Sequence, residues 1–231
     1  MSDQKTLMRD MLAHAVHFGH RTAKWNPKMA PYLHDKKNGV HIFDLNKTYT
    51  GLMAAKEFLT AASAQGKTVL FVSTKKQAIA PVKEAAERCG MPYVTSKWIP
   101  GLLTNFKTIR ARVDYMQKIK EEQENGEFDK YTKKEASKLM KQIDKLEAAL
   151  GGVATLERRP DIVFILDVCR DKIAVTEANT VGSKVVAITD SNANPDGVDY
   201  PIPGNDDAIK AIEFFLGHIV EAIEAGQKNK K

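Results

Sequence analysis

Acidic side chains that follow apolar segments are the first candidates for chemistry in this chain of 231 residues. Asp167, Asp171, Asp190 and Asp196 follow two such segments, and α/β proteins bind their ligands where buried strands end. Aspartate also caps helices and turns at these positions without any catalytic role. No nucleophile–base pair accompanies them, and the sequence contains no G-x-x-x-x-G-K-[ST], G-x-G-x-x-G or G-x-S-x-G motif. We therefore expect a protein that is not an enzyme.

Metal binding is the next chemistry to consider, because two histidines lie close together in the segment His17-Phe18-Gly19-His20. Zinc sites need three or four ligands, and no nearby cysteine or third histidine completes a set around His17 and His20. Hydrogen-bonded loop histidines explain the same pattern. The two cysteines, Cys89 and Cys169, lie in different segments and form neither a metal-ligand nor a disulfide pattern. We expect no metal and no cofactor.

Residues 20–37 combine positive charge with aromatic rings. The cations are Arg21, Lys24, Lys28, Lys36 and Lys37, and the rings between them are Trp25, Tyr32 and His34. Cations neutralise phosphates while flat rings stack on exposed bases, which is a combination suited to folded RNA. Trp25 and Tyr32 could also anchor an extended loop on the core, and this interpretation is compatible with RNA binding. We predict that Arg21, Lys24 and Lys28 contact phosphates.

A second basic site lies at Ser73-Thr74-Lys75-Lys76-Gln77, where a predicted strand ends and a helix begins. Free backbone N–H groups, the helix dipole and two ammonium groups favour a phosphate there. The alternative is an ordinary capped helix start. We predict phosphate contacts for Lys75 and Lys76.

A third basic cluster precedes a pair of predicted helices. Its members are Lys97, Trp98, Asn105, Lys107 and Arg110. We predict that the three cations contact phosphates and that Trp98, like Trp25, either stacks on a base or anchors its loop. Asn105, like Asn26, is a candidate for polar contacts with RNA.

The distribution of charge supports these candidates. Of 35 Lys+Arg and 29 Asp+Glu residues, the first hundred positions hold 15 basic and 7 acidic side chains, and the remainder hold 20 and 22. The net charge of +6 is therefore a segment of +8 joined to a remainder of −2. A local positive field attracts polyanions. No apolar run approaches the roughly 20 residues of a membrane span, and the N-terminus lacks a signal peptide, so we expect a soluble cytosolic protein.

The segments that position these residues alternate between strand and helix. Apolar strands are predicted at 40–43, 68–73, 93–95, 162–167 and 184–189, and helices at 5–16, 48–64, 75–89, 173–181 and 208–225. Continuous apolar strands between helices indicate a sheet buried on both faces. We predict an α/β fold with a doubly wound, mainly parallel sheet and helices on both faces, of Rossmann or flavodoxin-like type, formed by residues 1–104 and 151–231. Residues 17–37 are predicted to be irregular.

Two further segments fall outside this alternation. Residues 105–150 carry two amphipathic stripes separated by a polar turn, which predicts an inserted antiparallel coiled-coil hairpin. Asn105 is predicted to cap its first helix. The N-terminal helix carries an apolar stripe that we expect to be exposed for protein docking, formed by Leu7, Met8, Met11 and Leu12.

These stretches resemble the bacterial small-subunit ribosomal protein S-two family. The similar segments are His17-Phe18-Gly19-His20 with Trp25-Asn26-Pro27-Lys28-Met29, then 39–48, 69–78, 88–94, 101–110, 158–168 and 199–209, in family order over nearly the whole chain. Pro100 stands where family members usually have glycine, so this loop departs from the pattern. Ala193 stands where cysteine is common, which weakens any metal site there.

The resemblance implies a monomeric, structural component of a ribonucleoprotein, located in the cytoplasm on the small ribosomal subunit. Its expected partners are small-subunit ribosomal RNA, other small-subunit proteins, and the large mRNA-binding protein S-one. No membrane is expected. Two other classes remain as alternatives: a phosphate-binding α/β enzyme that uses residues 73–77, and a DNA-binding regulator, which would need a helix-turn-helix that the sequence lacks.

Overall fold

A five-stranded parallel sheet forms the centre of the computed structural model, which describes residues 2–229. Its strands are β4 (Val69–Val72), β5 (Tyr93–Val94), β6 (Ile162–Ile165), β7 (Lys184–Thr189) and β8 (Tyr200–Pro203). The order β5-β4-β6-β7-β8 is the 2-1-3-4-5 order of flavodoxin-like folds, and all four pairings are parallel. The predicted α/β class with a parallel sheet is confirmed.

Strand β8 escaped prediction because it contains Pro201 and Pro203. Proline cannot donate to a neighbouring strand, so it is confined to positions such as a sheet edge. β8 is one of the two edge strands of this sheet, and within the sheet it pairs only with β7.

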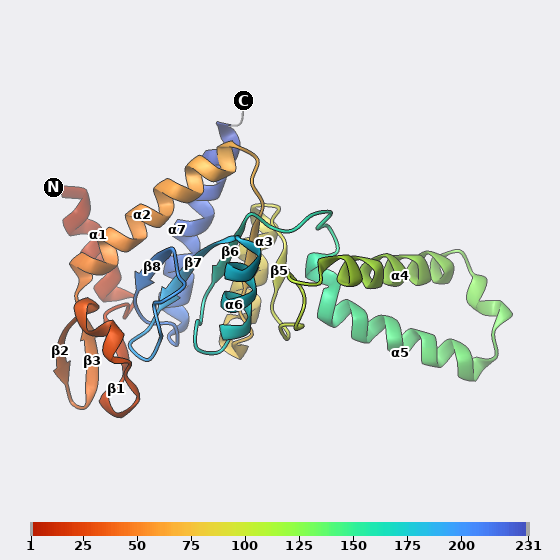
Figure 1. The fold of residues 1–231 in the computed structure, drawn as a ribbon, viewed down its shortest axis with the longest axis horizontal. Coiled ribbons are helices and arrows are strands. Elements are labelled where there is room, and N and C mark those ends of the chain that lie inside the picture. The colour runs from red at the N-terminus through yellow and green to blue at the C-terminus, as the bar shows by residue number, and fades with distance from the viewer. Residues whose placement is uncertain (1, 230–231) are drawn as a thin grey trace.

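Both faces of this sheet are covered, as the apolar strands predicted (Figure 1). On one face, Phe71 and Phe164 pack against four helices, which are α1 (Ser2–Ala13), α2 (Leu45–Ala64), α3 (Ile79–Arg88) and α7 (Ile209–Lys228). On the other face, Leu70 and Val163 pack against α6 (Lys172–Val181) and against the sheet-proximal ends of α4 and α5. Every residue of β4 and β6 is buried, because alternate side chains enter one core or the other.

A second, antiparallel sheet lies at the N-terminal end of the molecule. Its strands are β1 (Phe18–Arg21), β2 (Leu33–Lys37) and β3 (Val40–Phe43), in the order β1-β3-β2. Two 3-10 segments, η1 (Thr22–Lys24) and η2 (Pro27–Tyr32), connect β1 to β2. The expectation that residues 17–37 are irregular is therefore wrong. The missed signal is Asn38-Gly39, whose two positive φ angles of 51° and 75° form the hairpin turn between β2 and β3.

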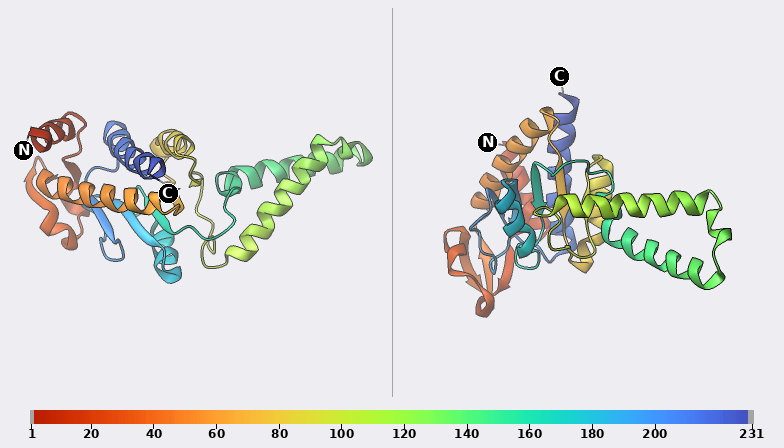
Figure 2. Two further views of the ribbon diagram at one scale, coloured as in Figure 1. Left: turned by 90° about the horizontal axis from the view of Figure 1, so that it is seen from above. Right: turned by 45° about the vertical axis from the view of Figure 1, so that its right-hand side comes forward.

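Helices α4 (Phe106–Glu124) and α5 (Lys133–Leu150) extend away from the sheet, joined through η4 (Glu127–Lys130). In Figure 1 they spread apart toward the connecting segment, whereas in the view from above (Figure 2, left) they spread apart nearer the sheet. Their axes therefore cross, and a coiled coil along their whole length is not confirmed. Buried Met116 and Ile119 of α4 and Ile143 of α5 lie on the facing stripes, and Lys120 forms an ion pair with Glu147.

The helix ends differ from expectation at two points. Asn105 precedes α4, but its side chain makes no capping hydrogen bond; its Oδ1 instead accepts from Thr108 Oγ1 at 2.9 Å. Helix α5 begins with a complete capping box between Thr132 and Glu135. The segment predicted as a helix over 75–89 starts as a 3-10 turn, η3 (Lys76–Ala78), before α3 begins. A last 3-10 turn, η5 (Gly151–Val153), follows α5.

Across the described residues 2–229, no helix combines the length and the apolar character that crossing a bilayer requires.

Candidate nucleic-acid interface

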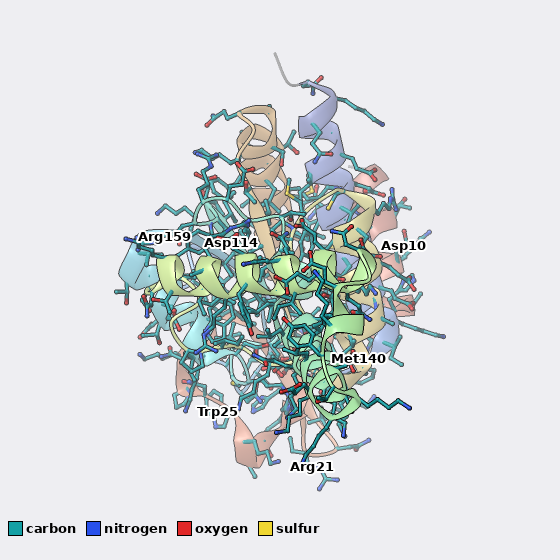
Figure 3. The ribbon with its side chains drawn as sticks, turned by 90° about the vertical axis from the view of Figure 1, so that its right-hand side faces the viewer. Asp10, Arg21, Trp25, Asp114, Met140 and Arg159 are labelled. Atoms are coloured by element: carbon teal, nitrogen blue, oxygen red, sulfur yellow. The ribbon has the colours of Figure 1, made fainter. Side chains whose placement is uncertain are left out.

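The basic segment 20–37 is mounted on the antiparallel sheet, where most of its cations face solvent. Arg21, Lys24, Lys36 and Lys37 are exposed, and among the described residues none of them forms an ion pair. Trp25 is 39% exposed and its ring centroid lies 5.1 Å from that of His41. Arg21 and Trp25 both project at the lower end of the molecule in Figure 3. This surface therefore offers unpaired cations beside an accessible ring.

Lys28 and Asn26 have a different role, because both tie this surface to the loop that follows β7. The ammonium group of Lys28 forms an ion pair with Asp196. The backbone N–H of Asn26 donates to the carbonyl oxygen of Ser191 at 2.8 Å, and its side chain accepts from the N–H of Lys28 at 3.0 Å. These two predicted RNA contacts thus shape the loop, and the side-chain oxygen of Asn26 is engaged within the protein.

His20 fastens the antiparallel sheet to the carboxyl edge of the parallel sheet. Its backbone N–H lies 2.7 Å from Ser191 Oγ and 3.2 Å from Asp190 Oδ1. Its ring lies between two carboxylates, with Nδ1 3.0 Å from Asp190 and Nε2 3.3 Å from Asp207. The hydrogen bond to Asp190, partly opposed by burial and supported by the nearby negative charges, raises the pKa of His20 to about 8. A protonated His20 can donate from both ring nitrogens and therefore bridges the two sheets.

His17 does not join His20 in any ligand set. Its ring packs against Phe18 at 4.0 Å between centroids, and burial lowers its pKa. The residues with ligand atoms near one another are His20, Asp190 and Asp206. The ammonium group of Lys75 already lies against Asp206 and supplies positive charge at this place.

Lys75 is the predicted site residue that the structure places furthest from expectation. It is only 7% exposed, and its Nζ lies 2.6 Å from Asp206 Oδ1, 2.6 Å from Asp207 Oδ1 and 3.2 Å from Asp167 Oδ2. Burial alone lowers the pKa of Lys75, but the charges and hydrogen bonds of Asp206, Asp207 and Asp167 together raise it. Its ammonium group is occupied by these carboxylates rather than presented to a phosphate.

The strand-to-helix turn at 73–77 is likewise filled from within the protein. The backbone N–H of Thr74 donates to Asp171 Oδ2 at 3.1 Å, and its hydroxyl donates to Asp171 Oδ1 at 2.8 Å. Burial raises the pKa of Asp171 although Thr74 partly opposes this shift. A carboxylate thus takes the place where a phosphate was expected. Lys76 remains exposed beside this turn.

The third basic cluster is organised by Glu177, which the sequence did not single out. This buried carboxylate of α6 accepts hydrogen bonds from Trp98 Nε1 at 3.0 Å and from Thr104 Oγ1 at 3.0 Å. It also accepts from the backbone N–H groups of Gly101, Leu103 and Thr104 at 2.7, 3.0 and 3.1 Å. Burial opposes ionisation, but these donors lower the pKa of Glu177. The sequence feature that could have identified Glu177 is its position on the apolar stripe of residues 174, 178 and 181, because a carboxylate buried there needs hydrogen-bond donors.

The cations of this third cluster divide into two groups. Lys97 and Lys107 are exposed. Arg110 is committed to the protein, because its guanidinium donates to the carbonyl oxygens of Ala154 and Leu156, each at 2.9 Å, and pairs with Asp114 at 2.8 Å. Trp98 is 5% exposed and anchors its loop, which leaves its ring unavailable for stacking.

The N-terminal helix exposes only part of its predicted docking stripe. Leu12 is 51% exposed, whereas Met11 is fully buried in the main core. Leu7 is half-buried against the same core, and Met8 is also half-buried. Met11 is therefore a core residue and the expectation of an exposed stripe is wrong at that position, because the helix turns this side toward the core formed with α2 and α7.

The three basic clusters are not joined into one patch. Figure 1 places the antiparallel sheet and the α4–α5 pair at opposite ends of the longest axis. The first two clusters are linked at one point, because the carboxylate of Asp207 contacts the side chains of both His20 and Lys75. The exposed cations at 21–37 therefore form a surface of their own, supported from beneath by an ionic cluster.

Comparisons with known proteins give a consistent result. Residues 11–226 match the family model described as ribosomal protein S2. The chain is 47% identical over 221 residues to a small ribosomal subunit protein uS2 of Dictyoglomus turgidum, with 96% of this chain and 90% of that protein covered. It is also 47% identical over 220 residues to the uS2 protein of Campylobacter curvus, covering 95% of this chain and 84% of that protein. A third relative, from Coprothermobacter proteolyticus, is 45% identical over 224 residues.

Proposed function

Because the chain belongs to the ribosomal protein S2 family, we propose that it binds the RNA of the small ribosomal subunit through its antiparallel sheet. The family consists of small-subunit ribosomal proteins and not of enzymes, so the chain is a structural protein of the ribosome in the cytoplasm. Family membership leaves open which residues meet RNA. The surface formed by β1, β2 and their 3-10 connection, residues 18–37, is called the basic sheet below.

The observation that carries this proposal is the set of unpaired cations on the basic sheet. Arg21, Lys24, Lys36 and Lys37 are exposed and lack ion-pair partners within the described part of the chain. Cations of this kind displace the counterions condensed on RNA phosphates, and this release favours binding. Trp25, exposed beside them, offers a ring for an unstacked base. A surface with both features fits folded RNA better than a regular duplex.

Further contacts come from exposed cations outside the basic sheet. Lys76, Lys97 and Lys107 keep their predicted role as phosphate contacts, since each is exposed. Lys75, Arg110 and Lys28 act as positioning residues, because their charged groups are bound to carboxylates or carbonyl oxygens of the protein. Trp98, Asn26 and Asn105 are also assigned to loop positioning.

Protein partners belong to the same proposal. Leu12 and Met8 of α1 present apolar surface for another small-subunit protein. We assign the large mRNA-binding protein S-one as a further partner on the basis of the family resemblance. Residues 105–150 form an inserted unit that reaches away from the domain made by 1–104 and 151–231, and the chain acts as a monomer within the ribonucleoprotein.

Competition for incorporation into small subunits tests the RNA surface. The double variant Lys24→Glu/Lys36→Glu removes two unpaired cations, and Lys172→Glu/Lys210→Glu is a control with the same charge change at exposed positions of α6 and α7. Tagged variant and untagged wild type compete for subunits lacking this protein, and the bound ratio is read after sedimentation. We expect the first variant to be outcompeted roughly tenfold, as expected for two lost phosphate contacts. Equal incorporation of both variants would refute the assignment to the basic sheet.

A further inference from the structure

Four lysines form a straight line along α5. Lys134, Lys138, Lys141 and Lys145 follow one another at spacings of 4, 3 and 4 residues. At 3.6 residues per turn, these spacings place all four side chains within a narrow sector of the helix surface. We call this set the lysine stripe.

The lysine stripe faces away from α4. The apolar residues of α5 that face α4 include Leu139, Ile143, Leu146 and Leu150, which also recur at spacings of 4, 3 and 4. Ile143 and Leu150 are 6% and 1% exposed, while all four stripe lysines are exposed. At about 100° per residue, the centres of the two stripes lie roughly 140° apart around the helix axis. Figure 3 looks onto this end of the molecule, with Met140 labelled on α5.

The lysine stripe also differs from the neighbouring helix in charge pairing. On α4, Arg110 pairs with Asp114 at 2.8 Å and Lys118 pairs with Glu122 at 3.9 Å, so two of its cations are neutralised within the helix. Glu135 and Asp144 lie three residues from Lys138 and Lys141 on the same helix, but none of the described side chains forms an ion pair with a stripe lysine. Like charges at these spacings repel one another and weaken a helix. An outward line of like charges is thus a structural cost that no ion pair among the described side chains offsets.

A phosphate backbone supplies the missing counter-charge. The helical rise of about 1.5 Å per residue separates successive stripe lysines by roughly 6, 4.5 and 6 Å along the axis, so each ammonium group can reach a different phosphate. Helix α5 contains no aromatic residue, and the positions that flank the stripe are Ser137, Gln142 and Ala148. Single-stranded RNA is held by stacking on rings, whereas duplex RNA is held through its backbone. We propose that the lysine stripe binds the phosphate backbone of a double-helical RNA segment.

This inference rests on the proposed RNA-binding function and adds a second, remote surface to it. The basic sheet, with Trp25, fits unpaired bases, whereas the stripe fits a duplex. The two surfaces lie at opposite ends of the longest axis (Figure 1), so one molecule can hold two RNA elements apart at a fixed distance.

Binding of the full-length chain to a short RNA duplex tests the stripe. Fluorescence anisotropy is recorded with a duplex of roughly 20 base pairs, longer than the ~16 base pairs that a compact duplex-binding domain spans, and with a single strand of the same length. The variant Lys138→Gln/Lys141→Gln is compared with Lys118→Gln/Lys133→Gln, which removes the same charge from positions of α4 and α5 that lie off the stripe. Glutamine and lysine have similar helix propensities, so helicity is preserved, and circular dichroism confirms it.

We expect the stripe variant to bind the duplex roughly tenfold more weakly than the control, with a log–log salt slope smaller by about 1 for each lysine removed. Equal duplex affinity of the two variants overturns the proposal, as does an equal loss for duplex and single strand. The variant Lys24→Glu/Lys36→Glu is measured in the same assay to test the basic sheet separately. If only this variant binds RNA more weakly, the proposal for the lysine stripe is overturned and the proposed function stands. If only the stripe variant binds RNA more weakly, the assignment of RNA contacts to the basic sheet is overturned.

Discussion

The ammonium nitrogen of Lys75 lies 2.6 Å from a carboxylate oxygen of Asp206, and the two residues are only 7% and 2% exposed. The same nitrogen lies 3.2 Å from Asp167, which follows β6, and 2.6 Å from the exposed Asp207. One cation therefore holds together the segments that follow β4, β6 and β8. Without it, carboxylates would be buried side by side without compensation.

Removal of this cation should destabilise the fold severely. In Lys75→Met the carboxylates of Asp206 and Asp167 lose their partner while still buried, and a broken buried pair of this kind costs about 3–5 kcal/mol. Urea unfolding of the full chain measures the loss. Lys76→Met, a change at the exposed neighbour, should alter the free energy of unfolding by less than about 0.5 kcal/mol. Similar stability of the two variants would show that the carboxylates do not depend on Lys75.

Stability should fall as the pH rises from about 6.5 to about 8. The pKa of His20 is raised to about 8, chiefly by its hydrogen bond to Asp190, so the folded state keeps a proton that the unfolded state has lost. This contribution is complete below about 6.5 and disappears as the pH passes 8.

Urea midpoints recorded between pH 6 and pH 9 test this linkage. His20→Gln keeps a donor toward Asp190 but cannot titrate, so its midpoint should fall less over this range than that of the wild type. Burial lowers the pKa of His17 and His218, so these two histidines act in the opposite direction up to about pH 7.5, but both variants contain them and their effect cancels in the comparison. A wild-type midpoint that falls no more than that of His20→Gln between pH 6.5 and 9 contradicts the bridging role of His20.

Replacement of Glu177 should loosen the loop before α4. An amide in Glu177→Gln offers one acceptor oxygen to the donors of Trp98, Gly101, Leu103 and Thr104, and its NH₂ group faces other donors. Leaving buried donors unsatisfied costs about 1–3 kcal/mol. The exposed change Glu84→Gln on α3 serves as the control. Chemical unfolding gives the cost, and a shift of tryptophan fluorescence toward longer wavelength reports water reaching Trp98; an unchanged spectrum and midpoint would argue against the clamp.

Much of the fold was predictable, because local patterns determine it. Each residue of β6 is apolar, and only a strand covered on both faces tolerates that pattern. The edge strand β8 was hidden by its prolines, which carry no strand propensity. The turn Asn38-Gly39 was a readable signal for β2 and β3, yet the basic residues around it favoured a loop.

The candidate site was harder to predict, because its contacts join residues that are far apart in the chain. Lys75 and Lys76 are neighbours of the same type, and nothing local distinguishes them. Only tertiary packing places Asp206 against Lys75, 131 residues away, and leaves Lys76 outside. The same holds for His20, whose partner Asp190 is 170 residues distant. Residue type predicts that a cation is present, whereas burial decides whether it meets protein or RNA.

Helix α2 contacts the edge strand so closely that a single methyl group should separate them. A Cβ atom at Gly51 would lie 2.6 Å from the carbonyl oxygen of Pro201 and 3.2 Å from Pro203 Cδ. Alanine normally stabilises a helix interior relative to glycine by roughly 0.5–1 kcal/mol. At this position the overlap with backbone should reverse the sign, so that Gly51→Ala loses about 1–3 kcal/mol. Gly217, in α7, is the matched control because a Cβ there meets nothing within 4 Å. Gly217→Ala should therefore raise the urea midpoint while Gly51→Ala lowers it; if both raise it, the approach of α2 to β8 is not a tight contact.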